Sequence, residues 1–157
     1  MAKKRKELTF YEKIQRIKEA GIKPVVVGED QKDEESLKSL DQRIQEMLGL
    51  SKSRLKHNEM IFFVMYDIED NRVRTQVSKF LLKKGCHRVQ KSIFLGRLER
   101  KQYNEIATAL KEIQEFYENK DSILLVPVSS DEMRAMKIIG ENVDFDVILR
   151  NRNTLFF

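Results

Sequence analysis

Three carboxylates follow a long apolar run in this 157-residue chain. The run covers residues 60–66, and Asp67, Glu69 and Asp70 come directly after it. Carboxylate oxygens are the ligands that Mg²⁺ prefers, and one or two of them suffice when substrate phosphate completes the coordination shell. Asp67 is therefore the first candidate for a metal ligand, with Glu69 and Asp70 as weaker ones. The alternative interpretation is an ordinary aspartate that ends a strand and opens a turn.

Other kinds of catalytic chemistry find little support in the sequence. His57 and His87 lie far apart in the chain, and the glycines are too sparse for a phosphate-binding loop or a dinucleotide fingerprint. Cys86 is adjacent to His87, but neighbouring side chains on a strand point to opposite faces. A single cysteine excludes an internal disulfide framework and fits a reducing cytosol, so we expect a cytoplasmic protein.

The apolar run is the element that must position Asp67. Its content of Ile, Phe and Val predicts a strand over residues 60–67 that is buried on both faces. Asp67 then sits at the carboxyl end of a core strand. There a carboxylate is held rigidly and still reaches a ligand.

The elements that follow predict an α+β fold. The pattern indicates a helix over 72–84 closed by Gly85, two short strands within 86–98, a helix over 99–118 and a strand over 122–128. Strand, helix, strand, strand, helix, strand is the order of the ferredoxin-like split βαβ fold with its antiparallel sheet. The helices of that fold cover one face of the sheet. Because both faces of the first strand are apolar, we expect a second copy on the other face, and thus a homodimer.

Residues 1–58 are predicted to be a helical extension that precedes a domain over residues 59–157. Apolar spacing indicates helices at 9–20 and 36–48, with Ser36 as a candidate N-cap and Gly49 as the stop of the second helix. Beyond the domain's last predicted strand, a short helix is expected at 131–138 and more strand at 143–149. No apolar span is long enough for a bilayer, so no membrane partner is expected.

Positive charge is segregated along the chain, which carries a net charge of +5. Between Arg72 and Lys101 there are ten basic residues and one acidic residue, Glu99. Such segregation is typical of a protein that binds the phosphate backbone of nucleic acid, although a solvated helix face is the simpler alternative. No zinc-finger spacing or aromatic RNA-binding motif is present. We therefore expect recognition of backbone and shape.

Several of these segments resemble the CRISPR-associated protein 2 family of small dimeric ferredoxin-fold nucleases. The similar stretches are FVMYDI at 63–68, NRVR at 71–74, RVQKSIFLG at 88–96 and the strand that begins at DSI, 121–123. The spacing between the aspartate of the first strand and the RVQKSIFLG stretch is similar as well. The resemblance covers about two-thirds of the chain.

The resemblance implies a homodimer that binds duplex DNA and scaffolds the CRISPR integrase, CRISPR-associated protein 1, during spacer acquisition. It also implies a metal-dependent endonuclease activity on RNA or double-stranded DNA, with Mg²⁺ as the cofactor. By position, Asp67 is the metal ligand and catalytic carboxylate of that activity. The remaining site residues that the resemblance implies are the phosphate-binding Arg72, Arg74, Arg88 and Lys91, and the adjacent Tyr66, Ser92 and Phe94.

Two parts of the chain have no clear counterpart in the family. Residues 1–58 inherit no role from it, and we expect their helices to pack on the dimer or on the integrase. Residues 140–157 match only loosely. A toxin ribonuclease of the VapD type, which shares the fold and the strand-end aspartate, is one alternative function. A non-catalytic ferredoxin-like module that binds a small ligand is another.

Overall fold

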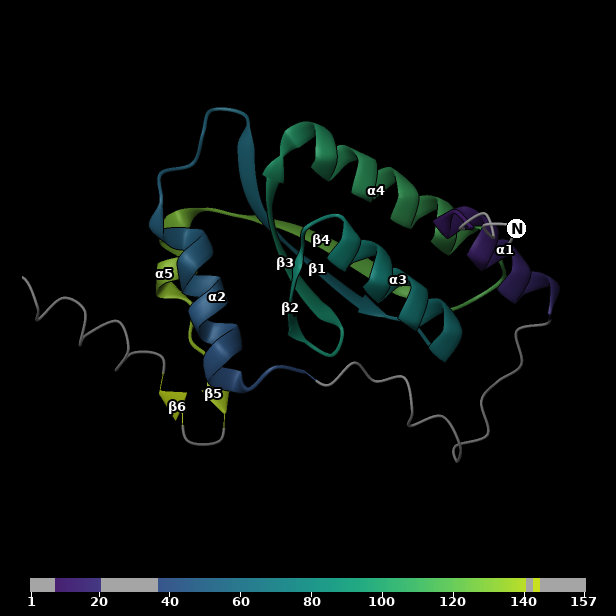
Figure 1. Cartoon of the computed structure of the whole chain (residues 1–157), viewed down its shortest axis with the longest axis horizontal. Helices are drawn as coiled ribbons and strands as arrows, with labels where there is room; N and C mark the ends of the chain where they lie inside the picture. The colour runs from purple at the N-terminus through teal and green to yellow at the C-terminus, as the bar shows by residue number, and fades with distance from the viewer. Residues whose placement is uncertain (1–7, 21–36, 141–142, 145–157) are drawn as a thin grey trace, which may run out of the picture.

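The computed structural model describes residues 8–20, 37–140 and 143–144. In chain order the elements are α1 (Phe10–Glu19), α2 (Leu40–Lys52), β1 (Glu59–Asp67), α3 (Asn71–Lys83), β2 (His87–Gln90), β3 (Ile93–Glu99), α4 (Arg100–Glu115), β4 (Ser122–Val128), α5 (Ser130–Ala135), β5 (Ile139–Gly140) and β6 (Val143–Asp144). Figure 1 shows the sheet at the centre, with α1 at one end of the molecule and α2 with α5 at the other.

The central sheet has four strands in the order β2-β3-β1-β4, and every pair in it is antiparallel. Strands β1 to β4 with α3 and α4 form the βαββαβ unit of a ferredoxin-like α+β fold, which confirms the prediction. β1 is central and pairs with β3 on one side and β4 on the other. β4 is an edge strand, and this explains why it accommodates Pro127, which has no backbone N–H to donate.

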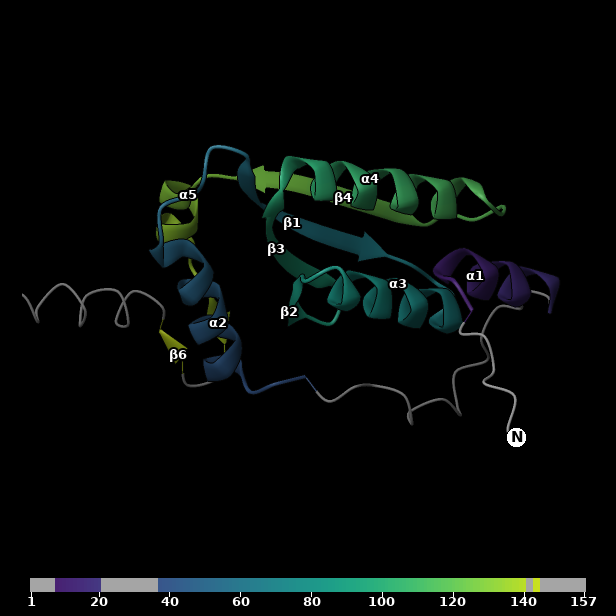
Figure 2. The same cartoon turned by 45° about the horizontal axis from the view of Figure 1, so that its top comes forward.

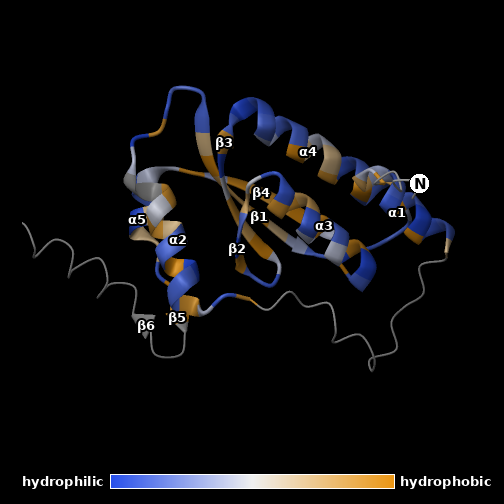
Figure 3. Ribbon diagram, in the orientation of Figure 1, coloured by the Kyte–Doolittle hydropathy of each residue, from blue (hydrophilic) through white to orange (hydrophobic). Residues whose placement is uncertain are grey.

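Helices α3 and α4 cover one face of this sheet (Figure 2). Alternation along β1 directs Phe62, Val64 and Tyr66 to this face, where they pack with Phe94 of β3. The apolar sides of both helices face the sheet and their solvent sides are hydrophilic (Figure 3). The helix residues buried in this core are Val73, Val77, Leu81, Ile106, Leu110 and Ile113.

Helix α1 closes the end of the α3–α4 layer. Its start is fixed by a capping box in which Thr9 and Glu12 each accept a hydrogen bond from the backbone N–H of the other. Ile14 is buried in the same core, and the ring of Phe10 stacks on Phe80 of α3 with centroids 4.4 Å apart. The first predicted helix of the extension is thus confirmed, and it packs on α3.

The opposite face of the sheet, here called the outer face, is partly covered by α2 and α5. Met47 of α2 and Met133 of α5 pack against Ile61, Phe63 and Leu95 of the sheet. β1 is therefore buried on both faces along most of its length, as its sequence predicts. The cover seen here comes from the chain itself. The second copy that the sequence predicts on this face would therefore meet α2 and α5 there.

The second helix of the extension differs in its limits from the prediction. It begins after the N-cap Ser39 and runs through Gly49 to Lys52, although Gly49 was expected to end it. A glycine inside a helix costs about 1 kcal/mol relative to alanine, and the burial of Met47 and Leu48, which directly precede Gly49, offsets this cost. The candidate N-cap Ser36 lies outside the described residues.

The C-terminal part of the chain also departs from the predicted limits. The short helix α5 ends at Ala135, three residues before the expected 138, and residues beyond it form the small β5–β6 pair. Of the strand expected at 143–149, the structure describes Val143–Asp144 as β6, and the remainder lies outside the described residues.

Candidate functional site

Asp67 is the last residue of β1, as its sequence context predicts. Its side chain is exposed, and its neighbour across the ladder is Ser122, the first residue of β4. Within the part of the chain that the structure describes, no hydrogen bond or ion pair engages its carboxylate. The end of β1 therefore presents an anionic group that is available to a ligand.

Asp70, the weaker metal candidate on the following turn, serves as the N-cap of α3. Its Oδ1 accepts hydrogen bonds from the backbone N–H groups of Arg72 (2.8 Å) and Val73 (3.1 Å), and its Oδ2 pairs with the Arg72 guanidinium at 3.0 Å. Burial raises the pKa of Asp70, but the hydrogen bonds from Arg72 and Val73 outweigh it and leave that pKa lowered. Both oxygens of the Asp70 carboxylate are thus engaged by α3 and serve its N-terminal cap.

A second aspartate, Asp121, fixes the turn after Asp67 from the other side. Its Oδ1 accepts the backbone N–H of Glu69 at 3.0 Å, and its Oδ2 accepts the hydroxyl of Tyr117. Burial and this hydrogen bond raise the pKa of Tyr117, which stays protonated as a donor. The turn that carries Asp67 is thus held both by the cap of α3 and by the start of β4.

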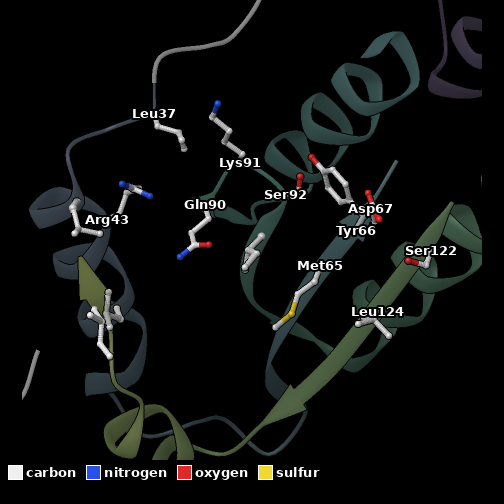
Figure 4. Close-up of a pocket in the computed structure, with 14 residues that line it drawn as sticks. Leu37, Arg43, Met65, Tyr66, Asp67, Gln90, Lys91, Ser92, Ser122 and Leu124 are labelled. Carbon is white, nitrogen blue, oxygen red and sulfur yellow. The ribbon is translucent and has the colours of Figure 1, made fainter. Parts of the chain in front are cut away.

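An open cavity of about 750 Å³ lies beside Asp67 on the outer face (Figure 4). Its apolar floor includes Met65, Ile93 and Leu124 of the sheet, and α2 supplies the opposite wall. The polar groups on its lining are Arg43, Asp67, Gln90, Lys91, Ser92 and Ser122. A cavity with one anionic end and cationic groups elsewhere suits a ligand that carries both phosphate and apolar surface.

Tyr66 connects this cavity to the basic side chains of the β2–β3 hairpin. Its ring stacks on Phe94 with centroids 6.0 Å apart, and the Arg88 guanidinium lies 5.8 Å from the centroid of Phe94 on the same side of the sheet. Burial raises the pKa of Tyr66, and the positive charges of Arg88 and Arg74 oppose this. The nearby Ser78 side chain on α3 also opposes it, and the buried Tyr66 hydroxyl makes no well-formed hydrogen bond among the described residues.

The structure brings some of the predicted site residues together and separates others. Asp67, Tyr66, Lys91 and Ser92 line one cavity, and Ser92 also accepts the backbone N–H of Tyr66 through its carbonyl oxygen at 3.0 Å. Phe94 is fully buried beneath Tyr66 and serves as its support.

The predicted phosphate-binding residues occupy two places. Arg88 and Lys91 belong to the β2–β3 hairpin, where Arg88 Nη2 donates to the Lys91 carbonyl at 2.8 Å. Arg72 and Arg74 lie on the first turn of α3, and the Arg72 side chain is 44% exposed although it pairs with Asp70. Hairpin and helix start together form a discontinuous basic surface around the end of β1.

The metal-ligating side chains of a single chain could hold Mg²⁺ only if other ligands completed its coordination shell. Among the described residues, no three His, Cys, Asp or Glu side chains come close enough to hold a metal ion. Asp67 is an exposed carboxylate that no other described residue engages, and Mg²⁺ is commonly bound by one or two carboxylates, waters and substrate phosphate. The residues present thus fit a Mg²⁺ ion whose remaining ligands are waters and a phosphate group.

Several residues that line the cavity are not among the predicted site residues. Ser122 and Leu124 follow from the predicted strand 122–128 once its pairing with β1 is known, because alternation places them on the outer face with Asp67. Arg43 and Leu40 come from α2, and no pattern in the sequence indicated on which face of the sheet that helix packs.

The fold and this site define a ferredoxin-like α+β domain with a carboxylate at the end of its first strand and a basic hairpin beside it. The family model described as CRISPR associated protein Cas2 matches residues 60–136, which run from β1 through α5. The chain belongs to this family through those residues, and a CRISPR-related role follows from that membership. No curated protein matches the chain. No described helix is both long and apolar enough to cross a membrane.

Proposed function

We propose that the protein is a CRISPR adaptation subunit that binds duplex DNA as a homodimer and scaffolds the integrase during spacer acquisition. The observation that carries this proposal is the family match over residues 60–136, which covers both the end of β1 and the basic hairpin. The exposed apolar side chains of Leu124 (59%) and Val126 (38%) on the outer face support a second copy there.

Phosphate contacts supply the affinity in this proposal. Arg88 and Lys91 on the hairpin and Arg74 on α3 are basic and lie next to the turn that carries Asp67. Lys and Arg that neutralise phosphates release counterions, so DNA affinity falls linearly with salt on logarithmic axes. Because the sequence carries no zinc-finger or aromatic RNA-binding motif, binding should depend little on DNA sequence.

The salt dependence of duplex binding tests this proposal. We expect Arg74→Ala and Lys91→Ala each to reduce the slope of log K against log [salt] by about 1, as loss of one phosphate contact does. Lys111→Ala is the matched control, because Lys111 is an exposed lysine on α4 that pairs with Glu115 at 3.8 Å. Equal slopes for all four proteins would contradict the proposed surface.

A metal-dependent phosphodiesterase activity at the same place is the second part of the proposal. Asp67 would hold Mg²⁺ together with phosphate oxygens, and the cation when bound would polarise the scissile phosphoryl group. Lys91 and Arg88 would orient the phosphate.

Asp67→Asn separates this activity from the scaffold role. We expect this variant to lose Mg²⁺-dependent cleavage of RNA or duplex DNA and to retain duplex binding and co-purification with the integrase. Asp131→Asn removes the same charge from an exposed aspartate of α5 that is not a metal candidate, and should leave cleavage unchanged. RNA cleavage without any integrase association would favour the toxin ribonuclease instead. Undiminished cleavage by Asp67→Asn would show that Asp67 is not the metal ligand.

A further inference from the structure

Helix α2 occupies the outer face of the sheet, which is the face that the proposed dimer requires. Ile44, Met47 and Leu48 of α2 are each at most 6% exposed. Met47 packs in one cluster with Phe63 and Leu95 of the sheet, and α2 also contacts β2. This helix lies in the part of the chain before residue 60, outside the family match.

One arginine of β3 holds the end of α2 against the sheet. The Arg97 guanidinium donates to the backbone carbonyls of Leu50 (2.9 Å), Ser53 (3.1 Å) and Arg54 (2.9 Å). It also pairs with the Glu59 carboxylate at 3.0 Å, where β1 begins. These bonds satisfy carbonyl groups that the end of a helix leaves without partners, and they fix the connection between α2 and β1.

Two further polar contacts fix α2 along the sheet edge. Arg43 donates from Nη1 to the backbone carbonyl of Val89 in β2, and Glu46 lies 3.8 Å from His87 Nδ1 on the same strand. The helix is therefore attached both by apolar burial and by polar contacts at each of its two halves. Such a set of contacts indicates a defined docking position.

A helix and a second sheet cannot occupy the same part of this face. A helix with its side chains is about 10–12 Å across, and two packed sheets are separated by about 10 Å. The layer that α2 fills is therefore the layer that a partner sheet would fill. With α2 in place, the apolar side chains of the outer face that remain most exposed among the described residues are Leu124 and Val126 on the edge strand β4.

We propose that α2 is an intramolecular cover that competes with a second copy for the outer face and so sets the affinity of the dimer. This inference rests on the homodimer of the proposed function. Residues 53–58 join α2 to β1, and a segment on so short a connection acts at an effective concentration on the order of millimolar. At a micromolar protein concentration, docking of α2 on the outer face is favoured over binding of a second copy, unless a partner or DNA displaces the helix.

Substitutions within α2 should shift the dimer equilibrium in opposite directions. Met47→Lys removes an apolar anchor of α2 without altering the sheet, and we expect it to lower the dimer dissociation constant at least tenfold. Gly49→Ala should raise that constant by up to about fivefold, because alanine favours the helix and a Cβ at Gly49 meets nothing within 4 Å. Gln45→Lys adds the same charge as Met47→Lys at an exposed position of the same helix and should change nothing.

Sedimentation equilibrium of the full-length variants measures these constants, and hydrogen exchange over residues 40–52 reports whether α2 is released. A tighter dimer for Met47→Lys together with faster exchange in α2 supports the cover. A dimer whose affinity is unchanged or weakened when α2 exchanges faster overturns it and leaves the proposed homodimer intact. Monomers for every variant up to millimolar concentration would overturn the homodimer and the cover together.

Discussion

The two faces of the β-sheet are closed in different ways. On the helix-covered face, Phe62, Val64 and Phe94 are completely buried beneath α3 and α4. On the outer face, α2 and α5 bury the region around Phe63, whereas Leu124 on the edge strand remains 59% exposed. The helix-covered face is a fully packed core, and the outer face has both a cavity and exposed apolar surface.

This difference follows from where the covering elements lie in the chain. Helices α3 and α4 are the crossovers of the βαββαβ unit, so the connectivity of the sheet itself places them on one face. Helix α2 precedes the unit and is held by apolar contacts and by the hydrogen bonds of Arg97. The outer face is thus the part of the molecule where occupancy can change without unfolding the sheet.

The largest expected effect compares two adjacent phenylalanines of β1 that point to opposite faces. Phe62→Ala should lower the free energy of unfolding by about 3–5 kcal/mol, because it leaves a cavity in a closed core where the ring also packs edge-on against Tyr103. Phe63→Ala should cost about 1–2 kcal/mol less, since α2 and α5 can move inward and fill part of the space. Urea unfolding measures both values.

The comparison fails if Phe63→Ala destabilises the protein as much as Phe62→Ala does. That result would mean that the outer cover is as rigid as the α3–α4 layer. Leu124→Ala serves as the control, because its exposed side chain should contribute little in the monomer.

Two glycines offer a second comparison of the faces. Gly96 of β3 faces Phe62 across the ladder, and a Cβ there would lie 2.5 Å from the Phe62 ring. Gly96→Ala should therefore lower the free energy of unfolding by about 1–3 kcal/mol through overpacking. Gly49→Ala in α2 should raise it by about 0.5–1 kcal/mol, because no atom lies within 4 Å of the new methyl group.

Thermal unfolding of both variants provides the measurement. A neutral Gly96→Ala would show that the Phe62 ring can rotate away, and thus that the closed face is less tightly packed than its burial indicates. Destabilisation by Gly49→Ala would show that α2 does not pack as a regular helix at that position.

The sheet and its two crossover helices could be predicted from the sequence because their signals are local. Three local signals each specify one element: the apolar run at 60–66, the helical spacing that ends at Gly85, and the apolar run before Pro127. Gly85 has a φ of 93°, as expected for a glycine that ends a helix. The order of those elements then leaves one common fold. The limits of α2 could not be obtained this way, because a tertiary contact sustains the helix through Gly49.

The candidate site was predictable in part. The position of Asp67 follows from the strand that precedes it. Asp70, in contrast, is buried because its side chain caps the N-terminus of α3. A cap signal was present in Asp70-Asn71, but the same residues also suit a turn. The contribution of Arg43 to the cavity could not be foreseen, since it depends on how an extension packs on a distant strand.

An effect smaller than those of Phe62→Ala and Gly96→Ala concerns the pH dependence of the Asp70 cap, which belongs to the closed side of the molecule. The pKa of Asp70 is lower in the folded protein than in the unfolded chain, so its ionised form stabilises the fold above the unfolded value near 4, and this contribution is lost as pH falls through the folded pKa. Asp70→Asn keeps a capping oxygen and loses the charge, which should cost about 1 kcal/mol at pH 6 and progressively less as pH falls below the unfolded pKa. Urea unfolding of both proteins from pH 6 to pH 2 gives this difference, and Asp131→Asn, at an exposed aspartate of α5, is the control. A difference that stays constant with pH would mean that the cap acts through its hydrogen bonds alone and that the ion pair with Arg72 adds nothing.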